Sequence, residues 1–111
     1  MLEASDRVQS LAALRNYKPR GAIEYLFDPT TGRLTVGRPA ASVGLKGSPH
    51  QQLAQSIGAD QSTVVGGMLR RGADGSLITD EMSGHFWQNW SPAVRDQFLS
   101  TMRGYGLDFT H

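Results

Sequence analysis

The chain has 111 residues, of which 39% are hydrophobic and 19% charged, with a formal net charge of +1. This length suits one domain with its own core, and the composition is that of a globular protein. The chain has no cysteine, which excludes a disulfide scaffold and a thiolate metal site. The charge gives no global signal for nucleic acid, so a polyanion would need a local basic patch. We find neither a signal peptide nor a membrane-spanning apolar segment, and we expect a soluble chain with no membrane partner.

The first part of the chain predicts a helix, a hairpin and a loop. Apolar residues at helical spacing between residues 5 and 16 indicate a helix that ends before Pro19. Residues 23–27 and 33–36 alternate as strands on either side of a turn-forming segment, so we expect them to form a hairpin. The glycine and proline content of residues 37–47 indicates a surface loop that could fold over a ligand.

A second helix should begin at Pro49. Ser48 can cap this helix, and Gln51 completes a capping box with it. Gly58 suits the end of the helix. The spacing of the apolar residues places His50, in the first turn, on the side that faces the core.

The remaining segments predict a second hairpin, a third helix and an edge strand. The hairpin pairs a strand over 63–71 with a return strand over 76–79, and the glycine pair at 66–67 indicates a bulge or a close approach to a ligand. Ser91 caps the last helix, and residues 107–110 can add an edge strand. The order α-ββ-α-ββ-α-β predicts an α+β fold with three helices and an antiparallel sheet of two hairpins plus an edge strand.

The segment 80–87 carries the clearest functional signal. If the return strand continues extended, Glu81, Ser83 and His85 face the same side. A carboxylate beside an imidazole can transfer protons near neutral pH, so we predict Glu81, His85 and His50 as catalytic residues that line one pocket. The structural interpretation remains open for each: a histidine bonded to the backbone, or a solvated carboxylate. These three side chains match no known metal motif, so we predict no metal.

Several other residues could hold a substrate. Three basic residues are the best available phosphate ligands. Among the aromatic residues, Phe86 and Trp90 suit a small core under the loop, whereas Trp87 could stack on a base. The predicted substrate-binding residues are Lys46, Arg70, Arg71, Ser83 and Trp87.

Four short blocks of the sequence resemble the polymorphic toxin type 43 domains, which form the C-terminal tips of large bacterial Rhs and contact-dependent inhibition proteins. The blocks are Gly47-Ser48-Pro49-His50, Val64-Val65-Gly66-Gly67-Met68, Glu81-Met82-Ser83-Gly84-His85-Phe86 and Gln88-Asn89-Trp90. The resemblance covers about residues 45–111 and does not place the first forty. We expect 1–111 to be a single toxin domain, with a peripheral N-terminal helix within residues 1–20.

The resemblance implies an antibacterial effector. Such a toxin is released from a larger carrier protein, secreted by the producing bacterium, delivered into the target-cell cytoplasm and neutralised by a cognate immunity protein. The class is regarded as ribonucleases, which implies an RNA substrate and no cofactor. Glu81 and His85 would then be the proton-transfer pair, with His50 as a second imidazole and a basic residue for the phosphate. Two alternatives stay open: an ADP-ribosyltransferase that consumes NAD through Glu81 and His50, and a non-enzymatic protein-interaction module.

Overall fold

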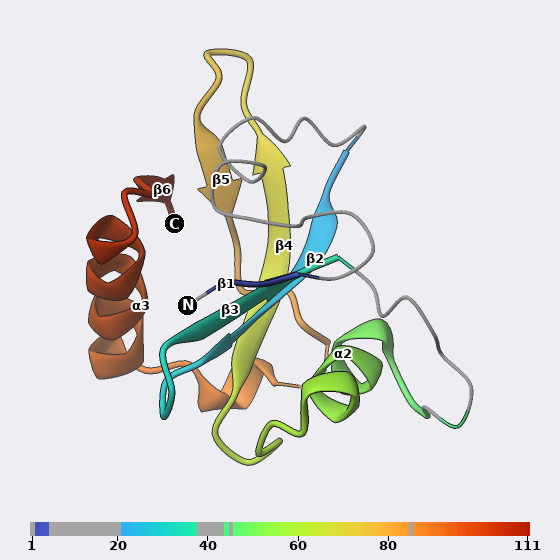
Figure 1. The fold of residues 1–111 in the computed structure, drawn as a ribbon. Helices are drawn as coiled ribbons and strands as arrows, with labels where there is room; N and C mark the ends of the chain where they lie inside the picture. Colours follow the sequence, from blue (N-terminus) through green and yellow to red (C-terminus); the bar gives the residue numbers. More distant parts are fainter. Residues whose placement is uncertain (1, 5–20, 38–43, 45, 85) are drawn as a thin grey trace.

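The computed structural model (Figure 1) describes residues 2–4, 21–37, 44, 46–84 and 86–111. The helix predicted over residues 5–16, most of the 37–47 loop and His85 lie outside the described residues. The elements in chain order are β1 (Leu2–Ala4), β2 (Ile23–Asp28), β3 (Arg33–Val36), α2 (Pro49–Ile57), β4 (Val65–Arg71), β5 (Leu77–Thr79), the 3-10 helix η1 (Trp87–Asn89), α3 (Pro92–Gly104) and β6 (Phe109–Thr110).

The six strands form one sheet in the order β1-β3-β2-β4-β5-β6. Both predicted hairpins are present, and β2 pairs with β4 in the middle of the sheet, all antiparallel. The two outermost pairs, β1 with β3 and β5 with β6, are parallel. The α+β class is therefore confirmed, but the all-antiparallel sheet is wrong. At the β6 edge the reason is the crossover through α3, which returns the chain so that β6 runs in the same direction as β5.

The two described α-helices lie where the sequence predicts them, because their ends carry local signals. At α2, the Ser48 side chain accepts a hydrogen bond from the Gln51 backbone N–H, and the Gln51 side chain accepts one from the Ser48 backbone N–H. Gly58 ends the helix with a φ of 65°. At α3, the Ser91 side chain accepts from the Val94 backbone. Neither described helix is long and apolar enough to cross a bilayer.

The sheet carries a separate apolar core on each face. Figure 1 shows α3 and α2 on different sides of the sheet. Phe98 of α3 packs with Tyr25 and Phe27, whereas Leu53 of α2 packs with Leu26. Successive residues of a strand point to opposite faces, so β2 supplies both cores and is buried along its whole length.

Candidate functional site

Three charged or titratable side chains meet where the chain leaves β5. The Glu81 carboxylate accepts two hydrogen bonds from Arg95, one from Nε at 2.6 Å and one from Nη2 at 2.9 Å. The Nε2 of His111 lies 2.9 Å from Oε2 of the same carboxylate. The other ring nitrogen, Nδ1, lies 2.8 Å from the Thr79 hydroxyl. We call Glu81, Arg95 and His111 the Glu81 cluster; its members come from the end of β5, from α3 and from the residue after β6.

The Glu81 cluster is packed against the core at His111 and exposed to solvent at Glu81 and Arg95. The His111 ring lies against Trp90, with ring centroids 4.8 Å apart, and against Phe98 at 5.3 Å. Only 6% of the His111 side chain is exposed, compared with 31% for Glu81 and 41% for Arg95. The imidazole is therefore fixed by packing, while the carboxylate and the guanidinium can meet a molecule from solvent.

Glu81 is ionised in this arrangement. The hydrogen bonds from Arg95 hold the pKa of Glu81 below its usual range; the bond from His111 adds to this effect, and partial burial opposes it. The same contact raises the pKa of Arg95. A proton acceptor and a cation thus lie side by side, both charged at neutral pH.

The backbone that carries Glu81 is fixed by its neighbour Asp80, to which the sequence analysis assigned no role. Oδ1 of Asp80 accepts hydrogen bonds from the backbone N–H of Met68, at 2.8 Å, and of Met82, at 2.9 Å. One carboxylate oxygen therefore joins β4 to the loop after β5. The residue between Asp80 and Met82 is Glu81, whose main chain is held on both sides.

A second anchor reaches Asp80 from the central strands. The buried Tyr25 hydroxyl donates to the Asp80 carbonyl at 2.6 Å. Burial, together with the charges of Asp80 and Glu81, raises the pKa of Tyr25, so its hydroxyl stays a donor. A Cβ on Gly67 would lie 1.9 Å from this same carbonyl oxygen, so a side chain there would displace the backbone. The glycine pair of β4 thus lets the backbone at Gly67 lie close to the backbone at Asp80.

The chain turns after Asp80 and does not continue as a strand to Ser83. Besides the Met82 bond to the Asp80 side chain, the Ser83 N–H donates to the Glu81 carbonyl at 2.9 Å. This turn sends the two side chains apart. Glu81 contacts Arg95 of α3, whereas Ser83 is buried and its hydroxyl accepts from the backbone of the following loop.

His50 lies in a different environment from Glu81. It is buried in the first turn of α2, and its Nε2 lies 2.8 Å from the Gly67 carbonyl oxygen. A Cβ on Gly66 would lie 2.9 Å from the His50 ring and 3.5 Å from Ser83, so these side chains gather on the α2 side of β4. Among the described contacts, none joins His50 to Glu81. The structure therefore gives His50 a backbone partner and, within the described residues, no contact with Glu81; His85, the third member of the predicted pocket, lies outside them.

The structure does not gather the residues predicted to bind substrate at one place, and Ser83 among them is buried. Lys46 and Arg70 are exposed, and Arg71 uses Nη1 to bond the Gly75 carbonyl in its own hairpin. Trp87 is 60% exposed on η1, while the flanking aromatic residues are buried. The cation that the structure places on Glu81 is Arg95. Within the described residues, no three His, Asp or Glu side chains group closely enough to hold a metal ion.

Sequence reasoning missed Arg95 and His111. Arg95 lies on the polar side of a helix, where a charged residue is ordinary. His111 reaches the site through strand register: Leu77 pairs with Phe109 and Ile78 with Thr110, so the next step places residue 111 beside Thr79. His111 could have been placed at the site only by predicting that the edge strand over residues 107–110 runs parallel, rather than antiparallel, to its neighbour.

Comparison with known proteins adds a family. No curated protein sequence and no solved structure matches the chain significantly. The family model described as bacterial toxin 43 matches residues 1–97. The match includes Glu81 and Arg95 and also the first forty residues, so the expected limit of the resemblance at about residue 45 is corrected. Because the match spans most of the 111 residues, the chain belongs to the bacterial toxin 43 family.

Proposed function

We propose that this toxin domain is a metal-independent ribonuclease whose active site is the Glu81 cluster. The observation that carries the proposal is a carboxylate held ionised between a guanidinium and a packed imidazole, at a surface open to solvent. Cleavage of RNA through its own 2′-hydroxyl needs a base, an acid and a cation for the phosphorane, and the cluster supplies one group of each kind.

The reaction assigns one role to each side chain. Glu81 takes the proton of the 2′-hydroxyl, and the 2′ oxygen attacks the adjacent phosphorus. The departing 5′ oxygen receives its proton from His111 by way of Oε2 of Glu81, because the His111 ring is packed and its Nε2 lies 2.9 Å from that oxygen. This step leaves a 2′,3′-cyclic phosphate and a 5′-hydroxyl. Arg95 uses Nε and Nη2 on Glu81, and its Nη1, which has no partner among the described residues, can donate to the phosphorane oxygens.

The contact between Glu81 and His111 supports a reset after each cleavage. The reaction leaves Glu81 with one proton more and His111 with one proton fewer. Their Oε2 and Nε2 atoms are 2.9 Å apart, which is hydrogen-bond distance. The proton can therefore return directly from the carboxyl to the imidazole once the product has left.

Exposed groups elsewhere on the surface suit a single-stranded RNA. Trp87 offers an exposed aromatic face, on which an unpaired base can stack. Lys46 and Arg70 are exposed cations for the backbone. As a member of a bacterial toxin family, the domain would be released from a carrier protein, secreted, delivered into the cytoplasm of a target cell and neutralised by an immunity protein.

The test compares the domain with two single variants on total RNA, with EDTA present and without NAD. We expect fragments that end in 2′,3′-cyclic phosphate, and a loss of about 10²- to 10⁴-fold for Glu81→Gln and for His111→Gln. The exposed carboxylate Asp108 provides the control, because Asp108→Asn should cleave normally. Expression in a bacterium should be toxic for the parent and harmless for Glu81→Gln.

Other outcomes would point to the alternatives. A toxic domain that leaves RNA intact contradicts the ribonuclease, and NAD consumption with a labelled macromolecule identifies the transferase. A domain that shows neither activity and no toxicity is an interaction module.

The variant His50→Ala separates the cluster from the histidine that the sequence favoured. If His50 is structural, its removal takes away the buried hydrogen bond to the Gly67 carbonyl and costs about 1–3 kcal/mol of stability. The folded fraction should cleave RNA at the parent rate, measured below the unfolding transition. A fully folded His50→Ala protein with a large loss of kcat would return His50 to the catalytic site and would also reopen the transferase.

A further inference from the structure

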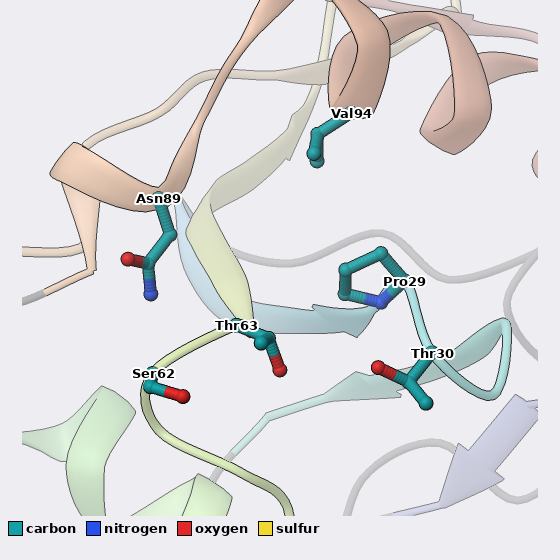
Figure 2. A pocket seen from close by; sticks show the side chains of 6 residues that line it. All are labelled: Pro29, Thr30, Ser62, Thr63, Asn89 and Val94. Atoms are coloured by element: carbon teal, nitrogen blue, oxygen red, sulfur yellow. The ribbon is translucent and has the colours of Figure 1, made fainter.

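A second feature, distinct from the Glu81 cluster, is an open cavity of about 370 Å³ at the start of α3. Figure 2 shows its walls, which come from the turn after β2, the loop before β4, η1 and the first turn of α3. Its lining residues are Pro29, Thr30, Ser62, Thr63, Asn89 and Val94. Cavities of this size lie within the range of small-ligand sites.

The hydroxyl groups of the cavity have defined hydrogen-bonding roles. The Ser62 hydroxyl donates to the Asp60 carboxylate at 2.7 Å, and the Thr63 hydroxyl donates to the Asp60 carbonyl at 3.3 Å. The bonds from Ser62 also keep the pKa of Asp60 below its usual range, so this acceptor stays charged. Because both hydroxyls already donate to Asp60, their oxygens can only accept hydrogen bonds from a ligand. The Thr30 hydroxyl has no partner among the described residues and can donate.

The remaining walls limit the ligand class. Figure 2 shows the Thr30 and Thr63 oxygens turned toward the space between them, with Pro29 and Val94 adding apolar surface. None of the described residues that line the cavity is charged. A phosphate or a carboxylate would therefore find no cation here, whereas a flat, neutral ring with amino hydrogens would find two acceptors and one donor.

The cavity lies close enough to the Glu81 cluster to serve the same molecule. Val94, in its wall, precedes Arg95 of the cluster along α3. Along the other boundary, Thr63 is four residues before Gly67, which touches Asp80, so Thr63 and Gly67 are roughly 13 Å apart along extended chain.

We propose that this cavity binds an unpaired nucleobase of the RNA substrate, one that carries an exocyclic amino group, at a nucleotide flanking the cleaved phosphate. The proposal rests on the ribonuclease function. Ser62 and Thr63 accept hydrogen bonds from the amino group, Thr30 donates to a ring nitrogen or carbonyl, and Pro29 and Val94 cover the ring. Adenine, cytosine and guanine fit this pattern, whereas uracil has no amino group.

The test measures binding without cleavage. Short 2′-O-methyl RNA oligonucleotides of A, C or U lack the free 2′-hydroxyl and stay intact, so their binding is read from backbone amide shifts of the labelled domain. We expect saturable shifts at Thr30, Ser62 and Thr63 with the A or C oligomer, and weaker binding of the U oligomer. Thr63→Val should weaken binding of the preferred oligomer about fivefold, and Thr30→Val provides the same test in an exposed turn. The control is Ser100→Ala, an exposed hydroxyl on α3.

Two results would overturn the proposal: shifts that map away from the cavity, or equal affinities for the parent and both valine variants. Because the probe is never cut, this failure is distinct from that of the ribonuclease. RNA cleavage with no shifts in the cavity rejects the base site alone, and binding in the cavity with no RNA cleavage rejects the ribonuclease alone.

Discussion

The charge state of Glu81 depends on one neighbouring side chain. Arg95 donates both hydrogen bonds that lower the pKa of this carboxylate most, and the bond from His111 comes second to them. A base with a lowered pKa stays in its active, ionised form as the pH falls. The same linkage applies to stability: the contribution of the pair is present above the unfolded pKa and is lost as the pH falls through the folded pKa.

We therefore predict that Arg95→Met moves the acid limb of the kcat/KM profile to higher pH. Without the guanidinium the pKa of Glu81 returns toward its ordinary value, so the base is protonated, and activity lost, at a higher pH than in the parent. The rate on the plateau should also fall, because the phosphorane loses its cation. The matched control is Arg103→Met, an exposed arginine on the same helix, which should leave the profile unchanged. An unshifted acid limb in Arg95→Met would show that Glu81 is not the titrating base.

At the scale of elements, the β4–β5 hairpin positions the site through a contact that only glycine permits. The strands pair in regular register up to Leu69 with Thr79, and the Asp80 N–H still bonds the Met68 carbonyl at 3.0 Å. The Asp80 carbonyl then passes over Gly67 at a distance that leaves no room for a Cβ. The close approach of the Asp80 and Gly67 backbones in this hairpin thus places Glu81 beside α3.

Gly67→Ala should accordingly harm both stability and activity. The added methyl group meets backbone, which cannot rotate away, so we expect a loss of about 1–3 kcal/mol in chemical denaturation. The shift of Asp80 should also lower kcat in the protein that remains folded, because it moves Glu81. Gly104→Ala is the matched control: a Cβ there meets nothing within 4 Å, and alanine favours the helix, so stability should be unchanged or slightly higher. Equal effects of the two substitutions would contradict the close approach.

At the scale of the whole molecule, the two cores share the central strands and should unfold together. Leu26 faces α2 while its neighbour Phe27 faces α3, so neither core can open without disturbing β2. A small domain of this kind is expected to unfold in a single cooperative transition.

Leu53→Ala tests this coupling by weakening the core under α2 while the core under α3 is observed. The substitution leaves a cavity under α2 and should cost about 2–5 kcal/mol. In a Trp87→Phe background the remaining tryptophan, Trp90, reports on the core under α3. The midpoint of Trp90 fluorescence and that of far-ultraviolet circular dichroism should fall together. If the Trp90 transition kept the parent midpoint, the two faces would unfold independently; Ser100→Ala, on the surface of α3, controls for nonspecific effects.

The sequence by itself determined the local features of this protein, because their causes lie within a few residues. The caps at Ser48 and Ser91 set where the helices start, and alternation set both hairpins. The carboxylate and the imidazole in the segment after β5 were enough to predict Glu81 as a site residue. The family was also recognisable from short blocks, although over fewer residues than the match to residues 1–97.

Only the tertiary structure decided which side chains meet Glu81. Arg95 and His111 are 14 and 30 residues away, and they arrive because α3 crosses back and sets β6 parallel to β5. No periodicity encodes that register, since residues so far apart are brought together by packing and not by local preference. For the same reason His50, which the helix pattern correctly turned toward a core, bonds β4 from the α2 side, while Glu81 turns to α3.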